Sequence, residues 1–236
     1  LPESRHISDE NRKKRFLLIQ EILKKEAADV LIHNAWPCQT LLWDLLAAKT
    51  LGVPYLQYDH GVFSGLLTTG IPAEMDQLRC AVRILALADH IVCLSETFAH
   101  FWRRFNPRVT ALLNPCPPAA EQAAPAERNP HLLLWVGRIS PEKQPEEAVR
   151  ILYELRKTLP DAALALVGGT DEACRPFEAE LRKEISHLGL EDAVSLEGYQ
   201  TEVAPYYEKA ALLLLTSAHE GFCLSVAEAK THGLPC

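Results

Sequence analysis

Residues 210–235 read AALLLLTSAHEGFCLSVAEAKTHGLP, and this stretch decides the fold. The apolar run 210–217 predicts a buried strand, and residues 222–232 predict a helix. A polar turn that contains Gly221 joins the two. A strand, a short glycine turn and a helix form a layout that points backbone N–H groups at a bound anion.

Two glutamates in this stretch, Glu220 and Glu228, bracket seven residues. Their carboxylates cannot serve an anion directly and are better suited to accept hydrogen bonds from hydroxyl groups. Phosphate and hydroxyl groups in one crevice indicate a nucleotide sugar. The alternative is that the two side chains are a helix cap and a solvated helix face.

The rest of the chain alternates between apolar strands and helices. Residues 115–130 contain five prolines and interrupt this alternation, which predicts a linker. We expect an α/β protein with two Rossmann-like domains, 1–114 and 131–236, each built on a parallel sheet. Strands are predicted at 30–33, 53–58, 90–94, 108–113, 131–136, 162–167 and 193–196. Helices are predicted at 9–26, 40–51, 73–89, 145–158, 171–188 and 203–209, and Ser95 is predicted to cap one more.

The composition limits the function classes. The chain has 236 residues, of which 48% are hydrophobic, so it can form two small domains with sizeable cores. The formal net charge of −7 argues against nucleic acid as a partner. The odd number of cysteines, seven, favours free buried thiols in a reducing compartment. No apolar run approaches the roughly 20 residues of a membrane span, and we expect a cytoplasmic protein.

A second informative stretch, residues 135–144, reads WVGRISPEKQ and follows a predicted strand. Gly137 frees the backbone at the turn. Arg138 and Lys143 bring two cations to the carboxyl end of the strand, where two positive charges suit a diphosphate. The alternative is a polar turn with both side chains solvated.

Together, these two stretches resemble the retaining glycosyltransferases of family 4. The resemblance lies in the order Gly-Arg-x-x-x-Glu-Lys, then Glu-x7-Glu, with LVGG at 166–169 and VSLEGY at 194–199 between them. It covers most of residues 90–236. It implies the GT-B fold, in which two Rossmann-like domains face a cleft, and a donor site in the second domain.

The resemblance also implies roles for individual residues. Arg138 and Lys143 neutralise the donor diphosphate, which the backbone amides of Leu224 and Ser225 also approach. Glu220, with Gly221 and Phe222, contacts the donor sugar and is a catalytic candidate. Glu228 holds the ribose hydroxyls, and Gly198 and Tyr199 lie near the base.

The first domain adds one catalytic candidate, His60, in the stretch QYDHGVF at 57–63. The family often places a histidine on this loop, where it reaches the donor sugar. The alternative is a structural histidine. Ser64 and Gly65 are weaker candidates for the acceptor side.

The expected reaction is transfer of a sugar from a UDP- or GDP-linked donor to an acceptor hydroxyl, with retained configuration. The chain has no Asp-x-Asp pair, so we expect neither a metal nor another cofactor. The resemblance implies attack on the front face of the sugar, so no side-chain nucleophile is assigned. It also implies a glycan or lipid-linked acceptor. The chain begins at Leu1 and ends in mid-pattern at Cys236, which predicts truncation at both ends.

Five other interpretations are weaker. Four soft side chains could form a zinc site: His219, Cys223, His232 and Cys236. A dinucleotide-dependent dehydrogenase would need Gly-x-Gly-x-x-Gly, which residues 168–170 do not supply. A non-catalytic binding module and a GT-B sugar-nucleotide epimerase fit the same fold. Residues 100–105, HFWRRF, could touch a membrane surface, but an ordinary amphipathic helix explains them better.

Overall fold

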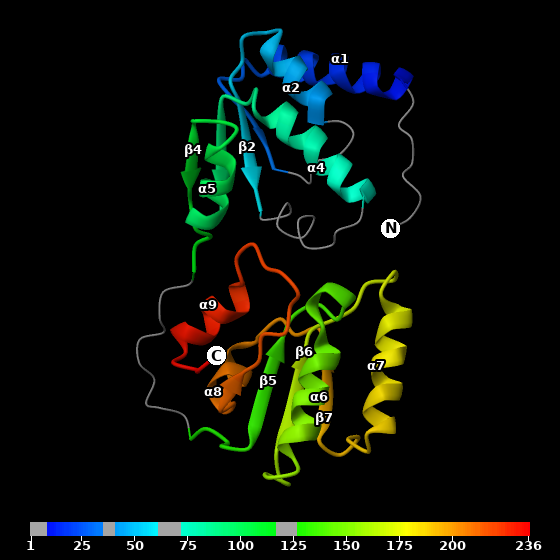
Figure 1. Ribbon diagram of the computed structural model, residues 1–236. Helices are drawn as coiled ribbons and strands as arrows, with labels where there is room; N and C mark the ends of the chain where they lie inside the picture. Colours follow the sequence, from blue (N-terminus) through cyan, green and yellow to red (C-terminus); the bar gives the residue numbers. More distant parts are fainter. Residues whose placement is uncertain (1–8, 35–40, 61–71, 117–126) are drawn as a thin grey trace. The chain divides into compact units, whose positions relative to one another are not determined.

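The computed structural model describes residues 9–34, 41–60, 72–116 and 127–236. The chain forms two compact units, Leu1–Asn114 and Pro115–Cys236, which we call unit 1 and unit 2. Within the residues that the structure describes, each unit contains one four-stranded sheet with parallel strand pairs (Figure 1). The predicted α/β class is therefore confirmed.

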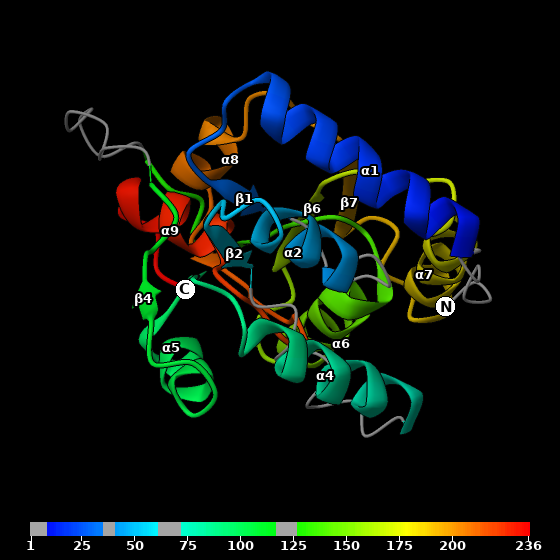
Figure 2. The same cartoon turned by 90° about the horizontal axis from the view of Figure 1, so that it is seen from above.

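Unit 1 is built on a sheet whose strands follow the chain order. The strands are β1 (Leu31–His33), β2 (Tyr55–Asp59), β3 (His90–Cys93) and β4 (Val109–Ala111). The helices are α1 (Asp9–Lys25), α2 (Leu41–Lys49), α4 (Pro72–Leu85) and α5 (Glu96–Arg103). Helix α1 packs alongside α2 (Figure 2). Ser95 caps α5 as predicted, because its Oγ accepts a hydrogen bond from the Phe98 N–H at 3.2 Å.

Trp102 on α5 belongs to the core of unit 1. Its side chain is fully buried, and its indole N–H donates to the buried Asp59 carboxylate at 2.6 Å. Phe101 also packs against this core. The central aromatic residue of the 100–105 stretch therefore faces the core, as expected for an amphipathic helix, and contact of the exposed residues of this stretch with a membrane stays a prediction. Among the described helices, none combines the length and the apolar content that crossing a bilayer requires.

Unit 2 is built on a sheet with the strand order β7-β6-β5-β8. The strands are β5 (Leu132–Val136), β6 (Ala163–Val167), β7 (Val194–Gly198) and β8 (Leu212–Leu213). The helical segments are the 3-10 turn η1 (Pro141–Lys143), α6 (Pro145–Leu155), α7 (Arg175–His187), α8 (Ala204–Lys209) and α9 (Leu224–Thr231).

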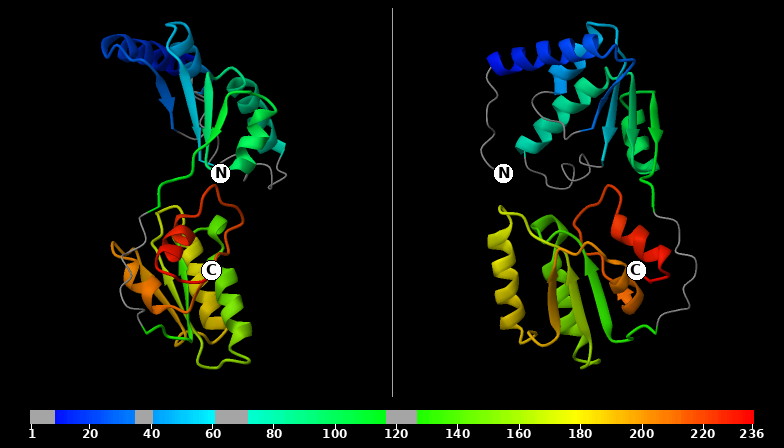
Figure 3. Two further views of the ribbon diagram at one scale, coloured as in Figure 1. Left: turned by 90° about the vertical axis from the view of Figure 1, so that its left-hand side faces the viewer. Right: turned by 180° about the vertical axis from the view of Figure 1, so that it is seen from behind.

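Alternate residues of the central strands of unit 2 build two separate cores. Leu133 and Trp135 pack with residues of α6 and α7. Leu134, between them in sequence, packs on the opposite face with residues of α8 and α9. Because successive strand side chains point to opposite faces, one five-residue strand serves both helix layers (Figure 3).

The strand order of unit 2 positions its functional loops. Strands β6 and β7 are added on one side of β5, and β8 is added on the other side. At such a reversal the loops after neighbouring strands diverge, and a crevice opens at the carboxyl ends. The turn after β5 begins with Gly137, and the loop after β8 contains Glu220.

Some sequence expectations differ from the structure. Strand β8 covers only Leu212–Leu213 instead of 210–217, because the chain turns outward after Leu214 and leaves Leu215 49% exposed. The six described cysteines are free, as expected, but of these only Cys93 is buried, because the others lie at solvent-facing helix positions or in loops. Cys38, Ser64 and Gly65 lie outside the described residues.

Arg128, in the predicted linker, holds the ends of two helices in unit 2. Its guanidinium donates to the carbonyl oxygens of Tyr207 (2.6 Å), Ala210 (2.9 Å) and His232 (2.7 Å). These carbonyls lie at the C-terminal ends of α8 and α9, where no later N–H group of the same helix can donate to them. One side chain therefore fixes α8 and α9 relative to each other.

Replacing Arg128 with alanine is expected to lower the free energy of unfolding of unit 2 by about 2–3 kcal/mol, because several partly buried carbonyls lose a charged donor. The measurement is urea unfolding followed by circular dichroism. Arg156→Ala is the matched control, since the Arg156 guanidinium donates to one carbonyl, that of Ala162 at 2.6 Å. Equal losses in the two variants would contradict the role assigned to Arg128.

Candidate functional site

A cavity of about 290 Å³ opens at the carboxyl ends of β5 and β8, and we call it the β5/β8 cavity. Six residues that the sequence predicted for the site line it: Lys143, Glu220, Phe222, Leu224, Ser225 and Glu228. Gly221 lies in the same loop, between two of these lining residues. The other lining residues are Trp135, Val136, Gly137, Leu214, Leu215, Ser217 and Cys223.

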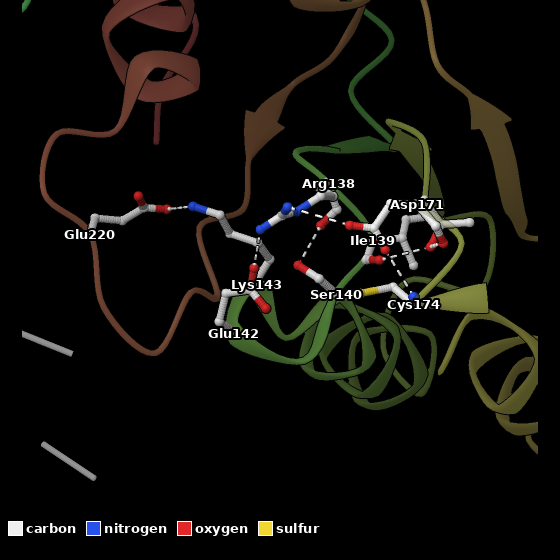
Figure 4. Close-up of polar contacts among 9 residues, drawn as sticks. Arg138, Ile139, Ser140, Glu142, Lys143, Asp171, Cys174 and Glu220 are labelled. Carbon is white, nitrogen blue, oxygen red and sulfur yellow. Dashed lines mark hydrogen bonds and ion pairs between the residues drawn. The ribbon is translucent and has the colours of Figure 1, made fainter. Parts of the chain in front are cut away.

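Lys143 and Glu220 form an ion pair at this cavity. The Lys143 ammonium donates to Glu220 Oε1 at 2.7 Å, and the two side chains are only 27% and 22% exposed (Figure 4). The partners come from η1 and from the loop after β8, 77 residues apart in sequence. In this structure the pair keeps a cation and a carboxylate together at the wall of the cavity.

Thr216, which sequence reasoning missed, holds the backbone at Lys143. Its hydroxyl donates to the Lys143 carbonyl at 3.0 Å and accepts from the Trp135 indole N–H at 3.0 Å. The end of β5, the η1 turn and the chain after β8 are thus connected through one hydroxyl group. The Thr-Ser pair at the end of an apolar run was the available signal.

Arg138 pairs with different carboxylates from Lys143. Its guanidinium donates to Glu142 Oε1 at 2.6 Å and lies 3.6 Å from the Asp171 carboxylate (Figure 4). The hydrogen bond to Glu142 raises the pKa of Arg138. Burial tends to raise the pKa of Glu142, but backbone and side-chain hydrogen bonds outweigh it and hold this pKa below its ordinary value.

Arg138 lines a second cavity of about 540 Å³ beside β6 and β7, which we call the β6/β7 cavity. Tyr199 lines the same cavity, and Gly198 ends β7 at a φ of +68°. Val136 and Gly137 line both cavities. The two predicted cations therefore lie in adjoining cavities that share the end of β5.

Helix α9 brings its first turn and Glu228 to the β5/β8 cavity. Leu224 and Ser225 begin the helix and line the cavity. The first N–H groups of a helix have no intrahelical acceptor, and the helix dipole places partial positive charge there. One turn further, Glu228 Oε2 accepts a hydrogen bond from the Tyr207 hydroxyl at 2.8 Å.

His60 lies in unit 1, directly after β2. It is exposed, it is hydrogen-bonded to Asn34 Oδ1, and its ring lies 4.7 Å from that of Tyr58. Because His60 belongs to unit 1 and the donor candidates belong to unit 2, its role toward a donor sugar stays a prediction.

The four candidate zinc ligands do not form a metal cluster. Within the described ranges, no group of three or more His, Cys, Asp or Glu side chains could hold a metal ion. Cys223 Sγ lies 3.2 Å from Ser225 Oγ, and the His232 ring stacks on Tyr207. Although the members of each predicted pair are four residues apart, these side chains contact different neighbours and do not converge on one point.

Comparison with known families decides which kind of protein has this site. The family model described as glycosyl transferases group 1 matches residues 119–236, which is half of the chain and includes every site residue of unit 2.

The chain belongs to the glycosyl transferases group 1 family.

Individual relatives agree with this assignment. The chain is 24% identical to UDP-Gal:alpha-D-GlcNAc-diphosphoundecaprenol alpha-1,3-galactosyltransferase of Escherichia coli, covering 98% of the chain and 63% of that protein. It is 30% identical to D-inositol 3-phosphate glycosyltransferase of Thermobispora bispora, covering 88% of the chain and 53% of that protein. The chain thus spans 63% and 53% of the lengths of these two relatives.

Solved structures show the same fold. The structure of Anabaena Alr3699/HepE in complex with UDP and glucose matches with a TM-score of 0.76 at 18% identity, covering 98% of the chain and 64% of that protein. The GT-B fold expected for this group 1 chain is therefore confirmed.

Proposed function

We propose that the protein is a retaining glycosyltransferase that moves a sugar from a nucleoside diphosphate donor to an acceptor hydroxyl. One observation carries the proposal. The β5/β8 cavity combines the Lys143 cation, the first turn of α9 and two carboxylates, Glu220 and Glu228. The cation and the helix end suit a diphosphate, and the carboxylates suit the hydroxyl groups of a sugar and a ribose.

In this proposal the bond between the sugar C1 and the diphosphate oxygen breaks, and the acceptor oxygen bonds to C1 on the same face. The acceptor proton passes to the leaving phosphate, so no side-chain nucleophile is needed. Lys143 and the N–H groups at Leu224 and Ser225 stabilise the negative charge that develops on the leaving group. These groups can supply that stabilisation without a metal ion.

The donor parts can be assigned to the two adjoining cavities. We assign the sugar to Glu220, Gly221 and Phe222, and the ribose to Glu228. The base is assigned to the β6/β7 cavity near Gly198 and Tyr199, where Arg138 contributes charge toward the diphosphate. Tyr199 is 78% exposed, so its ring is available to cover a bound base.

The relatives suggest the kind of donor and acceptor. The E. coli relative is named for a UDP-linked sugar and a diphosphoundecaprenol acceptor, and the Anabaena structure contains UDP. We therefore propose UDP before GDP, and a glycan or lipid-linked acceptor. A lipid-linked acceptor would place the enzyme at the cytoplasmic face of a membrane.

Calorimetric titration with UDP and GDP, with and without EDTA, tests this proposal. We expect micromolar binding of one nucleotide that EDTA does not change. Release of UDP from a UDP-sugar would then separate a transferase from a binding module. Absence of binding to both nucleotides would reject the proposed donor site, and binding that EDTA abolishes would reject the metal-independent mechanism.

Glu228→Ala is expected to weaken the binding of UDP and of UDP-sugars alike by roughly tenfold, because the ribose hydroxyls lose a charged acceptor. Calorimetry measures the two affinities. Glu180→Ala is the control, because Glu180 lies on α7, is 69% exposed and pairs with Lys183. Equal UDP affinity in Glu228→Ala and the unmodified protein would rule out the ribose role.

A further inference from the structure

Tyr207 contacts Glu228 from outside the cavity. Its hydroxyl donates to Glu228 Oε2 at 2.8 Å, across 21 residues of sequence. Glu228 lines the β5/β8 cavity, whereas Tyr207 is 1% exposed and does not line it. The hydrogen bond therefore reaches the functional carboxylate from the core of unit 2.

We propose that Tyr207 is a positioning residue that orients the Glu228 carboxylate toward the two ribose hydroxyls of the donor. This inference rests on the proposed function. The Tyr207 hydroxyl donates to one acceptor site of Oε2 and thereby restricts rotation of the carboxylate. Oε1 remains to accept from a ligand, so the side chain meets the ribose in one orientation instead of several.

Tyr207 is itself held in place by two contacts. Its ring stacks on the His232 ring with centroids 5.5 Å apart and an interplanar angle of 20°. Its carbonyl accepts from Arg128, which also donates to the His232 carbonyl. Tyr207 on α8 and Glu228 on α9 therefore belong to a single fixed frame.

The protonation of Tyr207 fits this role. Burial, with help from the hydrogen bond to Glu228, raises the pKa of the Tyr207 hydroxyl above its ordinary value. The hydroxyl therefore stays a donor across the neutral and mildly alkaline range. A carboxylate that keeps its donor at every working pH presents a constant geometry to the ligand.

The neighbouring Tyr206 provides a matched control. Its hydroxyl donates to Glu197 Oε2 at 3.1 Å, so it makes the same kind of bond from the same helix. Neither Tyr206 nor Glu197 lines the β5/β8 or the β6/β7 cavity. Tyr206→Phe thus removes an equivalent hydroxyl without touching the proposed site.

The test is calorimetric titration of Tyr207→Phe with UDP and with 2′,3′-dideoxy-UDP, which lacks both ribose hydroxyls. We expect UDP affinity to fall roughly threefold to tenfold, with little change for the dideoxy analogue. The preference of the protein for UDP over the analogue should shrink by the same factor. Tyr206→Phe should keep the full preference.

Other outcomes overturn the inference. Equal losses for UDP and the analogue would leave the preference unchanged and would indicate a merely structural role, and unchanged affinities for both ligands would show that Tyr207 does not orient Glu228. If Tyr207→Phe does not fold, the double variant Tyr207→Phe/Glu228→Gln replaces it and is compared with Glu228→Gln alone. A residue that acts only through the Glu228 carboxylate adds no further loss, so weaker UDP binding by the double variant would also reject the inference. An unmodified protein that binds no UDP would reject the proposed function and this inference together.

Discussion

Lys143→Ala is expected to weaken UDP binding by roughly tenfold to a hundredfold while leaving uridine binding unchanged. A charge-assisted contact to a phosphate contributes about 1.5–3 kcal/mol to binding. Uridine has no phosphate, so its binding does not depend on this contact. Lys143 lines the β5/β8 cavity and carries its charge at the wall. The measurement is calorimetry with both ligands.

Lys157→Ala is the control for this change. Lys157 is also paired with a glutamate, since its ammonium donates to Glu154 Oε1 at 2.6 Å, but it is 56% exposed and lines neither cavity. We expect no change in UDP affinity. A loss of uridine affinity in Lys143→Ala as large as the loss of UDP affinity would contradict a contact to the diphosphate.

The ion pair with Glu220 offers a second explanation that must be separated from the first. Without Lys143, the Glu220 carboxylate would stand alone at the cavity and repel a diphosphate. Lys143→Ala/Glu220→Gln removes this repulsion. If Lys143 contacts phosphate, the double variant still binds UDP weakly; if Lys143 only neutralises Glu220, the double variant recovers the affinity of the unmodified protein.

Local patterns in the sequence predicted the order of the strands and helices and six of the thirteen residues that line the β5/β8 cavity. Apolar strand runs and helical spacing are local signals, so the element order could be read directly. The seven residues between Glu220 and Glu228 cover the end of a loop and about one turn of α9, which allows both glutamates to line one cavity. Lys143 was predicted because the turn after β5 begins at the carboxyl edge of the sheet.

Long-range partners could not be predicted in the same way. Tyr207 meets Glu228, and Arg128 meets His232 104 residues away, only because α8 and α9 pack on the same face of the sheet. Arg138 appeared equivalent to Lys143 in sequence. In the structure, however, the Arg138 guanidinium pairs with the carboxylates of Glu142 and Asp171, whereas Lys143 pairs with Glu220.

The close approach at Gly168 is another feature that only the structure reveals. Gly168 has a φ of +150°, and a Cβ atom there would lie 1.7 Å from the Gly137 carbonyl oxygen. That oxygen cannot retreat easily, because the Gly137 N–H donates to the Val167 carbonyl at 3.0 Å. The Gly168 N–H in turn donates to Gly198 O at 2.9 Å, so the ends of β5, β6 and β7 are joined here.

Gly168→Ala is therefore expected to lower the free energy of unfolding of unit 2 by more than about 4 kcal/mol, a loss reserved for severe backbone conflict. UDP binding should fall with it, because Gly137 lines both cavities. Urea unfolding followed by circular dichroism measures the first effect, and calorimetry measures the second.

Gly189→Ala separates steric conflict from backbone preference alone. Gly189 has a φ of +66°, with no atom within 4 Å of the added Cβ. An alanine there meets only the left-handed penalty of about 1–2 kcal/mol. If Gly168→Ala lowered the free energy of unfolding no more than Gly189→Ala, the backbone at Gly137 would have to shift to make room for the added Cβ atom. The adjoining cavities would then be less tightly fixed than the proposed division of the donor between them requires.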